Sequence, residues 1–396
     1  MRSLPVTSDS GMVRAAKTLV YAVFIVLCLC GGFSVQVVGR LFFADLMMPV
    51  AFVGACLWPT TRRYIIAHWR EALLLLAFPV IGLVWDLLSH TPPGLYLRGL
   101  SRNLVFGVCA VVMMAMASRL SRAKMLVVFL ALAAAVPIAA IIQTPFEVTS
   151  VMIFVKYFGG WSMTFWLMLV IARLVSPMTA GIIMMPLGLT IALALSYRSL
   201  GGVLVLAGLF AVSAHLWKRM PRGGVIACVM VLPVVIAAIA ISIFQGDYVP
   251  EQLRSDWDYS NFQRLDMAVD AWRGFCDSPL WGSGSWAHAV RYTDVSQPGI
   301  LVGVHSFILQ FAFEYGVFGL LFGCWLLWLA VGGTVDFLQS NHPEDIRWMP
   351  MLLLVMLNLV YAILMSPMGG YERILAGTAL GISLAQIHRR RAFVVQ

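Results

Sequence analysis

Long apolar runs alternate with short polar turns along almost the whole chain, and one long polar stretch interrupts them. A run of about 20 apolar residues has the length at which an α-helix crosses a bilayer core. The pattern therefore predicts an all-α integral membrane protein, one transmembrane domain over residues 1–396, with a polar segment at 245–304. The twelve predicted spans cover residues 18–38, 41–58, 71–88, 102–118, 125–142, 161–175, 178–197, 201–217, 224–244, 305–331, 348–365 and 370–387.

The polar segment is predicted to contain an amphipathic helix. Ser260-Asn261-Phe262-Gln263 has the form of a capping box, which indicates a helix start at Ser260. Apolar residues then recur at spacings of three and four, as in a helix that lies along a membrane surface. These residues are Phe262, Leu265, Val269, Trp272 and Phe275, and Pro279 ends the helix. Arg264 would then lie in the first turns, where the helix dipole favours anions.

Composition supports a polytopic membrane protein. Hydrophobic residues make up 61% of the chain and charged residues 11%, with a mean hydropathy of +0.89, whereas soluble domains are about 25% charged. Arg14 and Lys17 precede the first span as in a signal peptide, but no A-x-A cleavage pattern follows, so we expect this helix to be retained. The seven cysteines form no CxxC pair, which gives no sign of a disulfide framework or metal site.

The distribution of basic residues predicts the orientation in the membrane. With a cytoplasmic N-terminus, the inner segments hold 17 of the 27 Lys and Arg residues, and four of the other ten lie in the long polar segment. Both termini are therefore expected in the cytoplasm and residues 245–304 on the outer side. The net charge of +9 follows from this asymmetry, so no nucleic-acid partner is expected.

Several arginines on the predicted outer side are candidate ligands for an anion. Arg198 lies in a tight turn between two apolar runs, where it either anchors lipid phosphate or holds a ligand diphosphate. Arg264 either pairs with a nearby Asp on a solvated face or binds an anion. The other candidates are Arg40, Arg98, Arg102 and Arg291, of which the first three are also potential partners of Asp45 and Asp86 within the predicted spans.

His305 opens the tenth apolar run, where water meets the predicted bilayer. An imidazole there can accept a proton near neutral pH, although a hydrogen-bonded structural histidine is the alternative. On a continuous helix Glu314 would point away from His305 and lie about 13 Å deeper, so we expect it to be a buried packing group. The glycine-rich residues 278–286 lack the spacing of a nucleotide-binding loop and are expected to form a plain turn.

Several segments of the chain, taken in their order and predicted topology, resemble the O-antigen ligase and polymerase family of lipid-linked glycosyltransferases. The matching pieces are the turn Ser196-Tyr197-Arg198-Ser199-Leu200-Gly201, Arg264 with residues 278–284, and His305-Ser306 followed by Glu314-Tyr315-Gly316-Val317-Phe318-Gly319. The chain departs from the family pattern at Tyr197, where Ser is expected directly before the arginine.

The resemblance implies glycan transfer from undecaprenyl diphosphate at the periplasmic face of the bacterial inner membrane. Arg198 and Arg264 would hold the leaving diphosphate, and His305 would remove the proton of an acceptor hydroxyl, with inversion at the anomeric carbon. Two guanidiniums can stabilise this leaving group without a metal or cofactor. Asp256-Trp257-Asp258 is expected to be a solvated turn before the helix rather than a metal ligand set.

Alternatives concern both the acceptor and the class of protein. A ligase would use lipid A core as acceptor, and a polymerase would extend another lipid-linked glycan. The compact outer segment slightly favours a polymerase. A transporter or flippase of lipid-linked oligosaccharide would bind near the membrane midplane and have repeated halves, but the polar candidates gather at one face. A non-catalytic envelope assembly protein is the other alternative.

Overall fold

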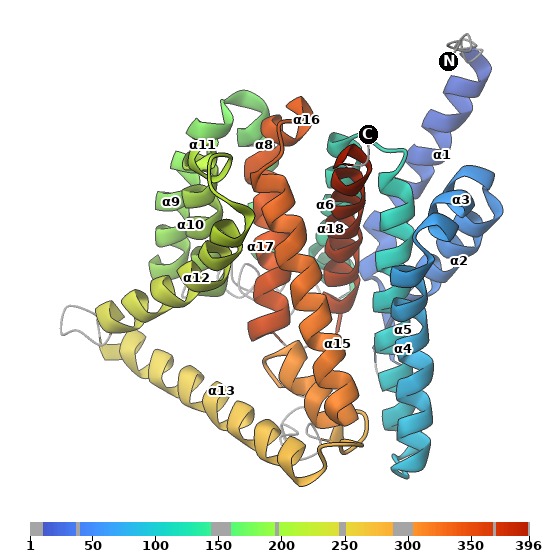
Figure 1. The fold of residues 1–396 in the computed structure, drawn as a ribbon, viewed down its shortest axis with the longest axis vertical. Coiled ribbons are helices and arrows are strands. Elements are labelled where there is room, and N and C mark those ends of the chain that lie inside the picture. Colours follow the sequence, from blue (N-terminus) through green and yellow to red (C-terminus); the bar gives the residue numbers. More distant parts are fainter. Residues whose placement is uncertain are drawn as a thin grey trace.

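The computed structural model describes residues 11–36, 40–143, 160–194, 198–244, 251–287, 304–366 and 370–394. These residues form a bundle that is almost entirely helical (Figure 1). The first half contains α1 (Gly11–Leu29), a 3-10 turn (Cys30–Gly32), β1 (Ser34–Gln36), β2 (Arg40–Phe42), α2 (Phe43–Leu57), α3 (Pro59–Ala67), α4 (Trp69–Leu88), α5 (Pro93–Ala117), α6 (Arg122–Gln143), α8 (Gly160–Leu174) and α9 (Pro177–Ala194). The second half contains α10 (Arg198–Val212), α11 (Ala214–Trp217), α12 (Arg222–Phe244), α13 (Glu251–Asp277), α15 (Phe307–Leu338), α16 (Pro343–Arg347), α17 (Met349–Met365) and α18 (Glu372–Val394).

Among the described residues, five helices are long and apolar enough to cross a membrane, namely α1, α4, α5, α6 and α15. Helices α2 and α3 form a further candidate that bends by 94°, because Pro59 starts a new helix. The apolar helices α8, α9, α10, α12 and α17 are shorter in their described parts. Each of the twelve predicted segments overlaps a helix, and how many of these cross the membrane stays a prediction.

The core lies among the central helices α5, α6, α17 and α18. Their facing side chains, such as Phe106, Phe129, Leu354 and Leu380, are at most 1% exposed. The peripheral helices α1, α2 and α4 instead leave many apolar side chains exposed, among them Leu19, Val50 and Leu88. Apolar surface of this extent is what a lipid-facing helix requires.

The first predicted span, residues 18–38, is wrong at its C-terminal end. α1 ends at Leu29, and the chain then turns through Gly31 and Gly32. A Cβ atom at Gly32 would overlap the backbone of Ala135 in α6, so glycine is needed where the two segments pass. β1 and β2 follow as an antiparallel pair with Val35 opposite Leu41, which adds a short hairpin to the predicted all-α fold.

Helices α9 and α10 form a closely packed pair. Gly188 lies against Gly201, and a Cβ atom on either residue would overlap the backbone of the other helix. Small residues allow membrane helices to approach in this way. Because α10 begins at Arg198, this packing fixes the backbone position of that residue, while its side chain lies outside the described part of the structure.

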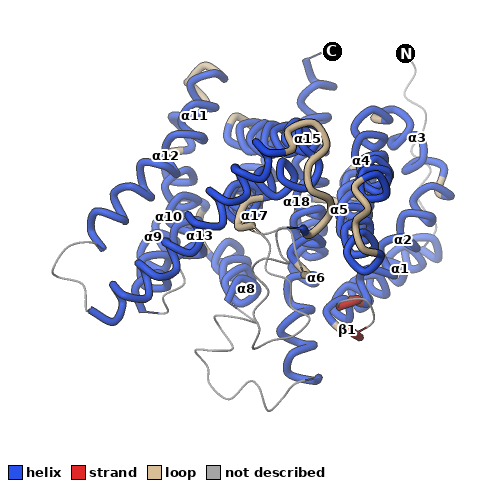
Figure 2. The backbone as a smooth tube through the Cα atoms, turned by 90° about the horizontal axis from the view of Figure 1, so that it is seen from below, coloured by secondary structure: helices blue, strands red, loops and turns tan. Residues whose placement is uncertain are grey.

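Helix α13 lies at one end of the bundle, and the C-terminal part of α18 lies at the other (Figure 1). Seen from below, α13 runs from the end of α12 toward α15 (Figure 2). α13 begins at Glu251, so the predicted start at Ser260 is wrong, as is the predicted turn at residues 256–258. The preceding residues include good helix formers, which carry the helix through the capping-box letters. Its end at Asp277, just before Pro279, agrees with the prediction.

Candidate active site

Helix α13 packs against the beginning of α15 through a face of small residues. Ala271 is 1% exposed and forms a buried cluster with Val304 and Phe313. One turn further on, a Cβ atom at Gly274 would overlap the Phe313 ring, so the two segments touch closely. Met267 continues the same face toward Arg264, and it is 2% exposed. Arg264 is thereby brought to the segment that contains His305.

The predicted apolar stripe of α13 lies on a different face. Leu265, Val269 and Trp272 are all exposed, with Leu265 at 64% and Trp272 at 50%. An amphipathic helix at a membrane surface keeps such side chains for the lipid boundary. The structure thus agrees with a surface helix. One side of it packs against the rest of the protein, and the other side exposes apolar side chains that could contact the membrane.

Helix α15 is not the continuous span that the sequence predicts. Tyr315 and Gly316 have non-helical backbone angles, and Gly316 has a φ of +62°, which glycine adopts without strain. Residues 307–314 and 317–338 therefore form two legs, which fold back on each other. The ring centroids of Phe311 and Phe322 are 5.7 Å apart, whereas a continuous helix would separate these residues by about 16 Å along its axis.

This fold-back reverses the predicted depths of His305 and Glu314. Ile308 on the short leg packs against Gly323 on the long leg, which lies about 10 Å along the helix from Gly316. The short leg therefore begins near Gly323, away from the kink, while Glu314 lies at the kink. The predicted depth of Glu314 is wrong, but its predicted burial is confirmed, because it is 1% exposed.

The glycine-rich residues 278–286 cap the broken helix. At a helix end, backbone carbonyls lose their partners. Here the carbonyl oxygens of Phe313 and Glu314 accept hydrogen bonds from the N–H groups of Ser283 and Gly284, at 2.8 and 3.0 Å. Gly284 has a φ of +85° in this turn. The run is therefore a structural turn, as predicted, and its N–H groups from Gly282 to Trp286 already donate to other groups of the protein.

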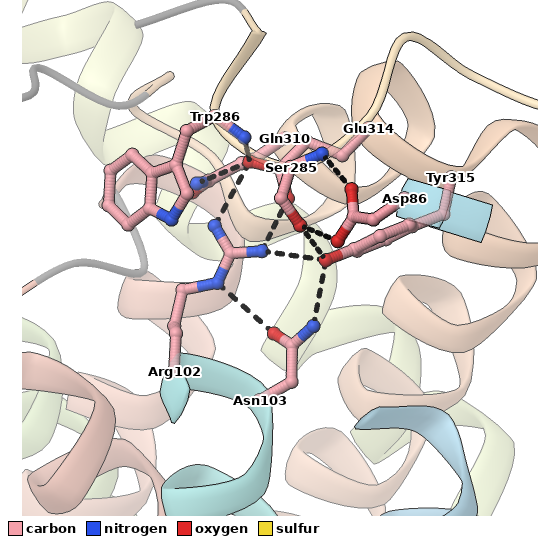
Figure 3. Close-up of polar contacts among 8 residues, drawn as sticks. All are labelled: Asp86, Arg102, Asn103, Ser285, Trp286, Gln310, Glu314 and Tyr315. Carbon is pink, nitrogen blue, oxygen red and sulfur yellow. Dashed lines mark hydrogen bonds and ion pairs between the residues drawn. The ribbon is translucent and has the colours of Figure 1, made fainter. Parts of the chain in front are cut away.

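A buried polar network fixes the turn and the kink to α4 and α5 (Figure 3). Arg102 of α5 forms a two-pronged ion pair with Glu314, and both side chains are at most 1% exposed. Asp86 of α4 accepts hydrogen bonds from the backbone N–H and the hydroxyl of Ser285, at 2.6 and 2.7 Å. Tyr315 joins the two halves through hydrogen bonds to Ser285 and Asn103. The network holds in place the kink from which the short leg returns to His305.

His305 and Arg264 are electrostatically coupled. Burial, together with the positive charge of Arg264, lowers the pKa of His305 from 6.5 to about 4. Ser306 next to it caps the short leg by accepting a hydrogen bond from Leu309 N–H. Among the side chains that the structure describes, none forms an ion pair with Arg264. The site therefore offers a neutral imidazole beside a cation and a helix N-terminus, which suits a proton acceptor near an anion.

The remaining predicted anion ligands differ in how far the structure places them. The backbones of Arg40 and Arg198 lie in β2 and at the start of α10, but their side chains are outside the described residues, as is all of Arg291. Arg98 lies half-buried on α5, one turn before Arg102. The guanidinium of Arg102 is fully enclosed and bound to Glu314, which favours a structural role over the predicted role of substrate ligand.

The two acidic residues of the predicted spans have found other partners than those suggested. Asp45 forms a buried ion pair with Arg373 at 2.5 Å, and Asp86 binds Ser285. The sequence marked both carboxylates as needing a partner, but Arg373 was not among the partners that it suggested. It missed Ser285, Asn103 and Tyr315, whose only sequence signal is a polar group near an apolar run.

A cavity of about 810 Å³ lies at the opposite end of the bundle. Its lining includes Arg122 and Asp345, which form an ion pair, and Arg390 and Asp336, which form another. Two of its three lining arginines are thus paired with aspartates, and the third, Arg389, donates a hydrogen bond to the Ala117 carbonyl oxygen. We therefore place the candidate site at His305 and Arg264 rather than at this cavity.

Comparison with known proteins gives one family match. No curated protein matches the chain significantly. Residues 182–324 match the family model described as O-antigen ligase, over slightly more than a third of the chain. The matched region runs from α9 to the long leg of α15, so it contains Arg198, Arg264, the glycine-rich turn and His305. Within this region the chain is similar to the O-antigen ligase family.

Proposed function

We propose that the protein transfers a glycan from undecaprenyl diphosphate to an acceptor hydroxyl at the periplasmic face of a bacterial inner membrane. The observation that carries the proposal is the approach of Arg264 on α13 to the partly buried His305, inside the region that matches the O-antigen ligase family. Both described ends of the chain lie at the end of the bundle opposite α13 (Figure 1). This arrangement supports cytoplasmic termini together with a periplasmic site.

His305 acts as the general base. A base must be unprotonated before it can accept a proton, and the lowered pKa of His305 keeps its ring neutral at physiological pH. A bound diphosphate beside Arg264 offsets the positive charge that helps to lower this pKa. Substrate binding therefore raises the pKa of His305 toward the range in which an imidazole accepts a proton effectively.

Arg264 and Arg198 hold the diphosphate. The acceptor oxygen attacks the anomeric carbon, the bond from that carbon to the diphosphate oxygen breaks, and its electron pair leaves with the diphosphate. The hydroxyl proton passes to His305, and the anomeric configuration is inverted. Guanidiniums fixed before the reaction stabilise the charge on the leaving group, and the N-terminus of α10, which begins at Arg198, adds free N–H groups. This step needs no metal.

Arg40, Arg98 and Arg291 are further contacts to the charged part of the donor in this proposal. Arg102 instead positions the short leg of α15, residues 307–314, through its ion pair with Glu314. The acceptor is a second lipid-linked glycan in a polymerase or lipid A core in a ligase, and we favour the polymerase because the outer segment is compact.

The test is a transfer assay with the purified full-length protein. It is given undecaprenyl-diphosphate glycan with or without lipid A core, and the products are separated by size. A ladder of longer glycans without core supports the polymerase, and a single shifted core band supports the ligase. If protein that is monodisperse in detergent shows no transfer under either condition, the proposed transferase activity is contradicted. Movement of the donor across a proteoliposome without transfer would identify a flippase instead.

A further inference from the structure

Three potential metal ligands meet at the end of the bundle opposite α13. His68 follows the last residue of α3, Glu71 lies in the first turn of α4, and His388 lies on α18. One ligand atom from each of these side chains lies within 4.8 Å of the other two. The cluster therefore joins the elbow between α3 and α4 to the last helix.

The cluster matches a metal site at one pair of ligands and departs from it at the other. The rings of His68 and His388 are stacked, with centroids 3.5 Å apart and planes 5° from parallel. His388 Nε2 lies 3.5 Å from Glu71 Oε1. Two ligands that each lie about 2.0–2.1 Å from a tetrahedral zinc ion are roughly 3.4 Å from each other. The stacked rings direct their nitrogen lone pairs in parallel, so the half-buried His68 ring must turn before both imidazoles can bind one ion.

His388 supplies a second sign of a ligand. Its side chain is 2% exposed, and its Nε2 makes no direct hydrogen bond within the described residues but faces the Glu71 carboxylate at 3.5 Å. The other ring nitrogen, Nδ1, lies 3.3 Å from the Tyr64 hydroxyl. A metal-bound histidine is arranged in this way, with one nitrogen toward the ion and the other held by a neighbouring polar group.

We propose that His68, Glu71 and His388 bind a divalent transition metal ion, with Zn²⁺ as the preferred ion. Two imidazoles and one carboxylate are a common zinc ligand set that leaves a fourth position for water. Arg391 Nη1 lies 3.4 Å from Glu71 Oε1, but its side chain is 66% exposed and can turn into solvent when a cation binds. The ion would fasten α18 to the elbow, at the end remote from His305.

The test measures metal binding by the full-length protein, purified with an affinity tag that contains no histidine and then treated with a chelator. Co²⁺ is added and followed by visible absorption, with Zn²⁺ as competitor. We expect one equivalent of Co²⁺ with the spectrum of nitrogen and oxygen ligands, and its displacement by Zn²⁺. His388→Gln and His68→Gln should each abolish this equivalent. Tyr64→Phe should weaken binding by roughly tenfold to a hundredfold, because it removes the support of Nδ1.

His342→Gln is the matched control, since His342 is an exposed histidine at the same end of the bundle. It should bind metal as the wild type does. Each variant must also show the elution profile and metal-free melting temperature of the wild type, so that lost binding is not lost folding; Glu71→Gln replaces any histidine variant that fails this check. Unchanged Co²⁺ binding in the ligand variants, a cobalt–thiolate charge-transfer band, or no binding by the wild type would overturn the proposal.

Discussion

Arg102 and Arg264 lie at the same end of the bundle and have the same charge, but their surroundings differ. Arg102 is fully buried, and Glu314 neutralises it between the rings of Trp286 and Phe311. Arg264 is half-buried, has no ion-pair partner among the described side chains, and lowers the pKa of His305. The comparison separates a charge that holds the backbone from a charge that is available to a ligand.

The contacts of Arg102 explain how the site around Arg264 and His305 is built. Arg102 fixes Glu314 at the kink, and the kink sends the short leg of α15 back along the long leg toward His305. The small face of α13 then brings Arg264 to the same place. Changes in the two regions should therefore differ in kind, with loss of stability in one and loss of transfer in the other.

The largest effect on transfer is expected from His305→Ala. A positioned general base contributes about 10²–10⁴-fold to a rate, and the variant loses this contribution while its melting temperature stays near that of the wild type. The transfer assay measures the loss. His288→Ala, which removes another histidine of the polar segment, is the control and should retain activity. Full activity in His305→Ala would exclude the proposed base.

Arg102→Ala is expected to act on stability. Removing one partner of a buried ion pair leaves the other charge unpaired, which costs about 3–5 kcal/mol. Unfolding in detergent should therefore occur at a markedly lower denaturant concentration. The double variant Arg102→Met with Glu314→Gln removes both charges of this pair and should be less destabilised than Arg102→Ala alone. Equal stability of Arg102→Ala and the wild type would show that Arg102 does not hold the kink.

Arg264→Ala should lower transfer by about 10²–10³-fold, the usual cost of losing a fixed group that stabilises charge in the transition state. Stability should change little, because no carboxylate among the described side chains is left unpaired. The control is Arg273→Ala on the same helix, whose side chain is 74% exposed. If the two variants lost activity equally, the effect would come from the general charge of α13 rather than from the site.

Much of the fold follows from the sequence, since hydropathy alone locates helices such as α4 and α6. The kink of α15 does not, because both legs are apolar and Glu314-Tyr315-Gly316 is compatible with one long helix. It forms because residues 278–286 supply new partners for the freed carbonyls. The start of α13 was also missed, because a capping-box pattern does not stop a helix that its upstream residues support.

The candidate site was predictable only in part. His305 and Arg264 stand out as polar residues on one predicted side of the membrane, and their catalytic roles stay predictions. The pairs Arg102–Glu314 and Asp45–Arg373 join residues more than 200 positions apart, so nothing in the local pattern reveals them. The sequence shows that a buried charge needs a partner, and only the packing of the helices selects which one.

The most direct test of the coupling between His305 and Arg264 is the pH dependence of kcat/KM, which reports groups of the free enzyme. Because the pKa of His305 is lowered to about 4, the base stays unprotonated in mild acid, and the wild type should keep its activity well below pH 6.5. In Arg264→Gln the electrostatic repulsion between Arg264 and protonated His305 is removed, so the pKa of His305 rises and the acid limb of the profile should move to higher pH. It should remain below 6.5, because burial, the larger cause, is unchanged. An acid limb at the ordinary histidine value in the wild type, unmoved in Arg264→Gln, would contradict the account.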